Sequence, residues 1–212
     1  MNIIVFGAAG AVGRRAVDEA LSRGHQVTAV IRQPEQAKLF QASVRVEFAD
    51  VLGSNGLEEL LVGQGLVISA LRPPAGWEQL LVPMTEKILR AAAACCVRVM
   101  VVGGAASLKL KNKDTTVLTE PGFLPEHLLP IATACQAQYE LCLKDNKADW
   151  TYQTPPAMLE PGVRTGQYRL GGDVMLADTG GQSRISMEDF AVALLDEAEQ
   201  IRHRRKRYSV AY

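Results

Sequence analysis

The chain has 212 residues, enough for one α/β domain with a substantial core, and its 23 basic and 23 acidic side chains leave no formal net charge. This balance argues against a general role on nucleic acids or at membrane surfaces, and no apolar run is long enough to span a bilayer. The four cysteines form no Cys-x-x-Cys pair, so we expect no metal site. Because the N-terminal apolar run is predicted to be a core strand rather than a signal peptide, the expected location is the reducing cytoplasm.

The first predicted elements are a strand, a glycine-rich turn and a helix. An apolar run over residues 3–6 precedes the turn, and residues 12–23 carry apolar side chains at helical spacing. The first glycine allows a sharp turn, the second lets a pyrophosphate approach the backbone, and the third lets helix and strand pack closely. Free N–H groups at the helix start would face the phosphates. This context predicts a dinucleotide site with the residues Gly7, Ala9, Gly10, Ala11, Val12 and Gly13.

The second predicted strand, residues 26–31, is followed by Arg32 rather than by a carboxylate. In such folds an acidic residue after this strand binds the ribose hydroxyl of NAD, whereas an arginine suits the 2′-phosphate of NADP. We therefore predict NADP as the cofactor, with NAD possible, and Arg14 could add positive charge. The alternative is that Arg32 is solvated and that Glu35 contacts the ribose.

Strands and helices continue to alternate along the chain. Further strands are predicted over residues 44–48, 66–69, 97–102 and 150–154, and helices over residues 77–95 and 125–146. Pro83 predicts a kink or a late start in the first of these helices, and Cys135 and Cys142 are expected on a buried face of the second. The alternation predicts an α/β fold, a Rossmann-type doubly wound parallel sheet, in a single domain over residues 1–212.

Glycines become dense after residue 155, where we predict a small substrate-side segment, residues 156–212, that is not an independent domain. It is expected to contain short strands over residues 167–170 and 183–185, a helix from an N-cap at Ser186 to about residue 200, and a last strand over residues 208–211. The basic run 202–207 is predicted to be a solvated helix end, with anion binding as the alternative.

Ligands of open parallel sheets bind outside the carboxyl ends of the strands. Asp50 and Val51 follow the third strand and could contact the adenine, although Asp50 could equally cap the next turn. The small residues after the fourth strand would let the backbone approach the cofactor. The further predicted cofactor-binding residues after the fourth, fifth and sixth strands are Ala70, Leu71, Arg72, Gly103, Gly104, Pro155 and Pro156. The last four are expected to flank the nicotinamide.

Several motifs together resemble a known group of proteins. They are the glycine turn and residues 102–108 (VGGAASL), 149–151 (DWT), 160–166 (EPGVRTG), 185–191 (ISMEDFA) and 208–212. On these motifs the chain is identified as an atypical member of the short-chain dehydrogenase/reductase superfamily. It is similar to the NADH-flavin reductase group and, more distantly, to biliverdin/flavin reductases and NmrA-like proteins. The resemblance implies a nicotinamide cofactor and a flavin or quinone-like acceptor.

One departure from the superfamily pattern concerns the proton donor. Typical members use Tyr-x-x-x-Lys, in which the lysine lowers the pKa of a tyrosine that protonates a carbonyl. The nearest pair here, Tyr139 and Lys144, is separated by more than one helical turn, so we expect no tyrosine general acid. Ser107 stands where the superfamily often places a hydrogen-bonding serine and is the candidate catalytic residue, with capping of the local turn as the alternative.

Each of the other polar side chains near the predicted cleft can have either a functional role or a merely structural or solvated one. His127 is expected to be structural rather than catalytic. Arg72 and Arg164 could hold an anionic substrate such as a flavin phosphate, and surface solvation is the alternative for both.

Two functions fit these features. The first is NAD(P)H-dependent reduction of a flavin or similar conjugated acceptor, which needs no proton donor from the protein because solvent can supply the proton. The second is a non-catalytic redox sensor that binds the dinucleotide and acts through a protein partner. A relative of the sugar-nucleotide epimerases is disfavoured by the absent Tyr-x-x-x-Lys and the short C-terminal segment.

Overall fold

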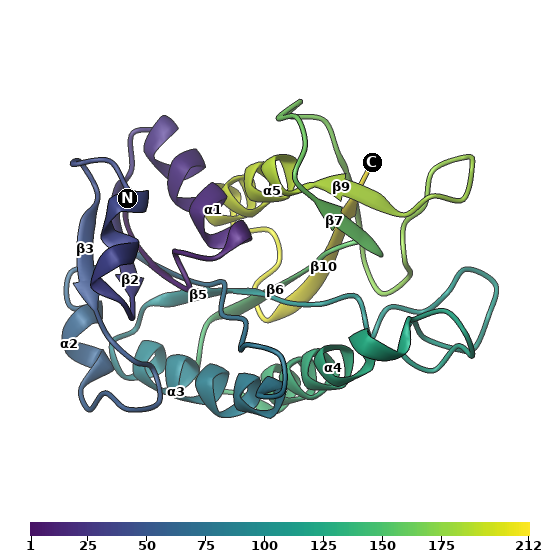
Figure 1. Cartoon of the computed structure of the whole chain (residues 1–212), viewed down its shortest axis with the longest axis horizontal. Helices are drawn as coiled ribbons and strands as arrows, with labels where there is room; N and C mark the ends of the chain where they lie inside the picture. The colour runs from purple at the N-terminus through teal and green to yellow at the C-terminus, as the bar shows by residue number, and fades with distance from the viewer.

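The computed structural model describes all residues, 1–212, and is built around an eight-stranded sheet between two layers of helices (Figure 1). The strands are β1 (Asn2–Phe6), β2 (Gln26–Ile31), β3 (Arg45–Phe48), β4 (Leu66–Ser69), β5 (Arg98–Val102), β6 (Trp150–Thr154), β8 (Arg169–Gly171) and β10 (Lys206–Ala211). Their order is β3-β2-β1-β4-β5-β6-β10-β8, and every neighbouring pair is parallel except β10 and β8. The predicted Rossmann-type fold is confirmed.

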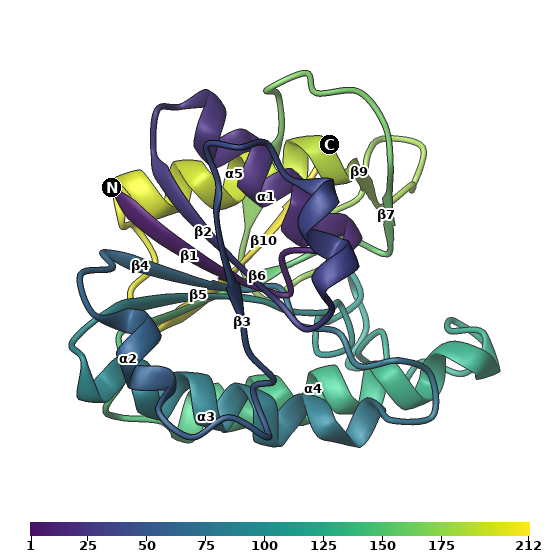
Figure 2. The same ribbon diagram turned by 60° about the vertical axis from the view of Figure 1, so that its left-hand side comes forward.

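Helices cover both faces of this sheet, as the two views in Figures 1 and 2 show. One face carries α1 (Ala11–Ser22) and α5 (Met187–Gln200), and the other carries α2 (Leu57–Leu61), α3 (Leu81–Ala94) and α4 (Leu129–Lys144). Short 3-10 turns are η1 (Pro34–Leu39), η2 (Glu78–Leu80) and η3 (Glu126–Leu128). The two helical layers bury the sheet, which is why the central strands are almost uninterrupted apolar runs.

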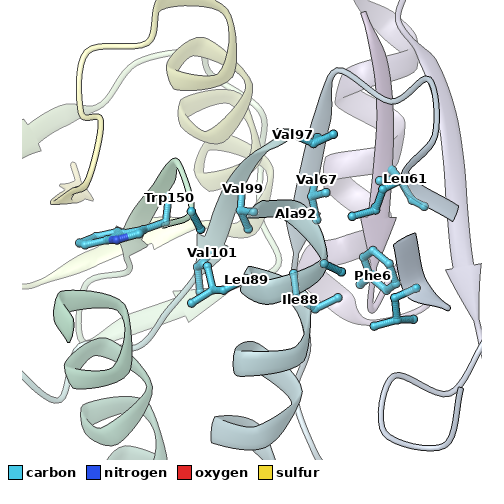
Figure 3. Close-up of a cluster of buried hydrophobic side chains, with 14 of the residues drawn as sticks. Phe6, Leu61, Val67, Ile88, Leu89, Ala92, Val97, Val99, Val101 and Trp150 are labelled. Atoms are coloured by element: carbon cyan, nitrogen blue, oxygen red, sulfur yellow. The ribbon is translucent and has the colours of Figure 1, made fainter. Parts of the chain in front are cut away.

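The core is divided by the sheet into two hydrophobic clusters, because alternate residues of a strand point to opposite faces. Figure 3 shows one of them, in which side chains of β4 and β5 such as Val67 and Val101 meet Ile88 and Leu89 of α3. The other cluster joins the remaining strand residues to α1 and α5. The same packing leaves the carboxyl ends of the strands at one edge, where the loops meet.

Several element boundaries differ from the sequence predictions. The helix predicted from residue 77 begins at Leu81 after η2, so Pro83 lies in its first turn, where no N–H partner is lost; this confirms the late start. The helix α2 and the strand β7 (Met158–Glu160) were not predicted, because such short elements show too little periodicity. The strand β7 pairs with β9 (Arg184–Ser186) in a separate parallel ribbon.

The basic run 202–207 is mostly solvated, as predicted, but the prediction that it is a helix end was wrong. The helix α5 ends at Gln200, and Ile201 adopts a left-handed conformation with φ of 52°. The chain then turns into β10, which pairs with β6. The side chain of Arg207 in β10 is only 5% exposed and pairs with Asp173, so this part of the run belongs to the interior.

A hydrogen-bonded clamp joins the two late motifs of the sequence. Asp189 Oδ1 accepts the N–H groups of Thr165 at 2.8 Å and Gly166 at 2.7 Å, and Oδ2 accepts the Tyr212 hydroxyl at 2.6 Å. Ser186 Oγ accepts the Asp189 N–H at 3.0 Å, which confirms the predicted N-cap of α5. The EPGVRTG loop is thereby fixed to the start of a helix that packs on α1.

Candidate functional site: a dinucleotide cleft joined to an apolar cavity

The candidate site lies where the carboxyl ends of β1 and β4 meet. From β1 the sheet continues through β2 on one side and β4 on the other, and such a switch point is where ligands bind in open α/β sheets. Gly7 turns the chain with φ of 74°, and a Cβ atom there would lie 2.4 Å from the Ala70 carbonyl oxygen. A Cβ on Gly13 would lie 2.1 Å from the Gly7 carbonyl oxygen. The outer glycines are therefore required for the turn to pack at all.

We expect Gly13→Ala to destabilise the protein by about 1–3 kcal/mol. The added methyl group would overlap backbone atoms of Gly7 and Ala8, which cannot move aside as a flexible side chain can. In an ordinary helix the same change stabilises the protein by about 1 kcal/mol. The sign of the change in the free energy of unfolding therefore shows whether the methyl group overlaps the backbone. Urea unfolding of both proteins measures it. An increase in the free energy of unfolding would contradict the packing described here.

A first cavity of about 230 Å³, here called the cleft cavity, runs from the glycine turn over the end of β2. The predicted residues that line it are Gly7, Ala9, Gly10, Arg32, Val51, Ala70, Leu71 and Arg72. No carboxylate lines it, and the first turn of α1 contains no acidic residue. Free N–H groups at the start of α1 and two arginines form an electropositive, concave surface that fits the phosphates of a dinucleotide.

Arg32 reaches the cleft cavity from the end of β2. Its backbone N–H and that of Gln33 donate to Gln36 Oε1, both at 3.2 Å, in a capping box that starts η1. Its guanidinium group has no acidic partner. Glu35, the alternative ribose contact, is exposed and does not line the cavity, and Arg14 faces a separate polar cavity on α1.

Asp50 and Val51 were both predicted to contact the adenine, but only Val51 lines the cleft cavity. Val51 is buried and lines the cleft cavity. Asp50 does not line it, and its Oδ1 accepts the Leu52 N–H at 3.1 Å, the turn-capping alternative.

A second cavity of about 600 Å³, here called the apolar cavity, is lined by 24 residues, 17 of them hydrophobic. It shares five lining residues with the cleft cavity, namely Gly10, Ala70, Leu71, Arg72 and Pro73. The predicted residues Ala11, Val12, Gly103, Gly104, Pro155 and Pro156 also line it. Sequence reasoning missed its far wall, which includes Leu81, Leu124, Leu128, Ile131, Leu159 and Met187. Those residues come from segments with no common motif.

Cys135 on α4 also lines the apolar cavity, although it was predicted to be a core residue like Cys142, which is fully buried. Burial raises the pKa of the Cys135 thiol to about 11, and the positive charge of Arg72 acts against this rise. The thiol packs against Gly104, where a Cβ atom would lie 2.7 Å from its Sγ. The thiol is therefore protonated at neutral pH and is a weak acid.

The backbone beside this thiol rests on Tyr152 of β6, which is fully buried. The Gly104 N–H donates to the Tyr152 hydroxyl at 3.3 Å, and this hydroxyl donates to the Cys135 carbonyl at 3.1 Å. A Cβ atom on Gly103 would lie 2.0 Å from the Tyr152 ring. Tyr152 thus fixes the position of the Gly103-Gly104 backbone in the wall of the apolar cavity.

Ser107 and Tyr139 line neither cavity. The guanidinium group of Arg207 donates to the Ser107 hydroxyl and lies over the Tyr139 ring, 4.3 Å from its centroid. Lys144 is exposed at the end of α4. The structure therefore places the candidate catalytic serine outside both cavities, with its hydroxyl bound by an arginine of the last strand.

The remaining polar candidates also lie outside the apolar cavity. His127 is exposed in η3 and lines neither cavity. Arg164 forms a bidentate pair with the buried Glu19, with Nε–Oε2 and Nη2–Oε1 distances of 2.7 and 2.9 Å. Of the two arginines considered for an anionic substrate, Arg72 alone reaches the cavity.

A sequence model of a family described as NAD(P)H-binding matches residues 7–198. The chain belongs to this NAD(P)H-binding family. It is 32% identical over 212 residues to the uncharacterized protein YwnB of Bacillus subtilis, covering 99% of this chain and 98% of that protein. The predicted family, with a nicotinamide cofactor, is confirmed.

Solved structures of similar proteins share the whole fold. A Bacteroides thetaiotaomicron protein provisionally named an epimerase is 37% identical, with a TM-score of 0.91 over 100% of this chain and 96% of that one. A Streptococcus pneumoniae protein provisionally named an NADH-flavin reductase is 31% identical, with a TM-score of 0.90 over 100% and 99%. None of the helices in this chain is long and apolar enough to cross a membrane.

Proposed function

We propose that this protein is an NAD(P)H-dependent reductase that transfers a hydride to a flavin or a similar conjugated acceptor, with NADPH as the preferred donor. The observation that carries the proposal is the apolar cavity, which opens directly from the cleft cavity through shared residues such as Gly10 and Leu71. A dinucleotide along the glycine turn would bring its nicotinamide to Gly103 and Gly104 at the wall of this cavity. The cavity volume of about 600 Å³ fits a second planar ring system.

The chemistry follows from which groups line the cavity. A bound nicotinamide supplies the hydride, and the protein supplies binding, orientation and exclusion of water. The lining side chains include no Asp, Glu, His, Lys or Tyr, and the Cys135 thiol is a weak acid with a pKa of about 11. A ketone would need a proton donor at the developing alkoxide, whereas a conjugated acceptor takes the hydride and receives its proton from solvent. The site therefore favours conjugated acceptors.

The similarity to the Streptococcus pneumoniae protein, whose provisional name is NADH-flavin reductase, supports the flavin as acceptor. The preference for NADPH is supported by Arg32 at the cleft cavity instead. We further propose a cytoplasmic location, where NAD(P)H is supplied and where the four unpaired cysteines would stay reduced.

The test is oxidation of NADPH and NADH, followed by absorbance, with and without FMN, riboflavin and a soluble quinone. We expect turnover that depends on the acceptor and is faster with NADPH. Gly10→Val protein, in which the cleft is filled, is the matched negative control. Tight NADPH binding with no turnover on any acceptor would overturn the reductase and favour a redox sensor that acts through a protein partner.

Tyr139→Phe tests whether a tyrosine general acid operates. The hydroxyl lies outside both cavities, while the ring packs against Tyr152 and under Arg207, so phenylalanine keeps the packing. We expect kcat to stay within about twofold of the wild-type value. A loss of about 10²- to 10⁴-fold would instead identify this residue as the acid.

A further inference from the structure

The apolar cavity contains one charged side chain, that of Arg72. All its other lining side chains are hydrophobic or uncharged at neutral pH, and no carboxylate lines either cavity. Arg72 lines the cavity and is also exposed to solvent, so an anion bound there can accept charge-assisted, bidentate hydrogen bonds from its guanidinium group with no carboxylate competing for them.

Arg72, like Arg32 in the cleft cavity, differs from several other arginines of the chain in having no acidic partner. Arg15 pairs with Glu188, Arg164 with Glu19, and Arg207 with Asp173, each at hydrogen-bonding distance. Arg72 forms no ion pair with any carboxylate of the chain. Its cationic charge is therefore available to a ligand, at no cost of breaking an internal salt bridge.

The loop after β4 fixes where this charge lies. Arg72 precedes two prolines, and a residue before proline is restricted to extended backbone. Pro73 is buried and lines both cavities, which anchors the loop. Arg72 and Cys135 on α4 both line the apolar cavity, and the positive charge of Arg72 lowers the pKa of the Cys135 thiol against the larger effect of burial.

We propose that the acceptor carries an anionic group, a phosphate or carboxylate, on an otherwise apolar planar ring system, and that Arg72 binds this group and sets acceptor specificity. This inference rests on the proposed function, because it names the class of acceptor that the apolar cavity takes. The competing source of the same chemistry is the pyrophosphate of the dinucleotide, since Arg72 also lines the cleft cavity. If Arg72 binds the acceptor, its removal weakens binding of an anionic acceptor; if it binds the pyrophosphate, its removal weakens binding of the dinucleotide.

A comparison of FMN with riboflavin distinguishes these two roles of Arg72, because the two flavins have the same ring system and only FMN carries a phosphate. We expect wild-type kcat/KM to be higher for FMN than for riboflavin, and Arg72→Ala to lower the ratio of the two kcat/KM values about 10- to 100-fold. Because Arg72 also lines the cleft cavity, the dissociation constant for NADPH is measured in the same variant, and it should rise by less than the dissociation constant for FMN does. Arg72→Lys, which keeps the charge without the bidentate fork, should retain part of the FMN preference.

Arg90→Ala is the matched control, since Arg90 is exposed on α3 and lines neither cavity. It should leave the ratio of FMN to riboflavin unchanged. Equal losses on FMN and riboflavin, or weaker NADPH binding with the flavin preference intact, would overturn the inference and assign Arg72 to the dinucleotide.

A binding measurement keeps this inference separate from the proposed function. Quenching of flavin fluorescence by the protein with NADP⁺ reports affinity without turnover. A wild-type preference for FMN that disappears in Arg72→Ala supports the anion site even if no acceptor is reduced, in which case the proposed function alone fails. Equal affinities of the wild-type protein for FMN and riboflavin would overturn the anion site even if both flavins are reduced.

Discussion

We expect Gly10→Val to abolish dinucleotide binding in a protein that still folds. Gly10 precedes α1 with φ of −74° and ψ of 166°, a backbone conformation that valine adopts readily. A Cβ atom there would meet one neighbour within 4 Å, the Gly7 carbonyl oxygen at 3.2 Å, so a small shift accommodates it. The two γ-carbons would then occupy space at the junction of the two cavities, where the pyrophosphate must approach the backbone.

We expect the dissociation constants for NADPH and NADH to rise by more than about 100-fold, equivalent to about 2.7 kcal/mol or more. Titration of each nucleotide against intrinsic fluorescence measures this, and thermal unfolding shows that the fold is intact. Gly10→Ala, which adds only the Cβ atom, should give a smaller loss. Unaltered NADPH affinity in folded Gly10→Val protein would show that the dinucleotide does not lie along this turn.

We expect Arg32→Glu to reverse a preference for NADPH over NADH. Arg32 lines the cleft cavity at the end of β2, is exposed, and has no acidic partner to lose. A guanidinium group there can bind the 2′-phosphate of NADPH bidentately, whereas a carboxylate repels that phosphate and suits the ribose hydroxyl of NADH. We expect the dissociation constant for NADPH to rise by about 100-fold and that for NADH to change by less than about threefold.

Arg14→Glu is the matched control for this charge reversal. Arg14 is an exposed arginine on the first turn of α1 that lines a separate polar cavity. The same change of charge there should alter both affinities alike and by no more than about threefold, through the long-range field alone. Equal losses of NADPH and NADH affinity in Arg32→Glu would show that Arg32 does not read the 2′-phosphate.

The nucleotide half of the site illustrates what can be predicted from sequence. The strand, the glycine turn and the start of α1 involve residues that are close along the chain, so their spacing alone determines how they can pack. The sterics bear this out, since Gly7 and Gly13 each lie where a Cβ atom would overlap backbone. Arg32 could be placed at the cleft for the same reason, because it directly follows a strand whose carboxyl end faces the turn.

The apolar half of the site was less accessible to sequence reasoning. Its far wall combines the loop after β5, the first half of α4, the strand β7 and the first residues of α3 and α5, which approach one another only after the sheet is assembled. Short elements such as β7 are held by pairing with a distant strand rather than by a local pattern. No spacing rule along the chain relates these segments.

By itself the sequence determined the α/β alternation, the Rossmann-type parallel sheet and the glycine turn after the first strand, because these depend on local periodicity and on glycine sterics. The tertiary structure alone decided which polar side chains remain free. It binds Ser107 to Arg207 and Arg164 to Glu19, and leaves Arg72 facing an apolar cavity. Ion pairs form between groups that packing brings together from distant parts of the chain, so charge and chemistry at the site depend on the complete fold.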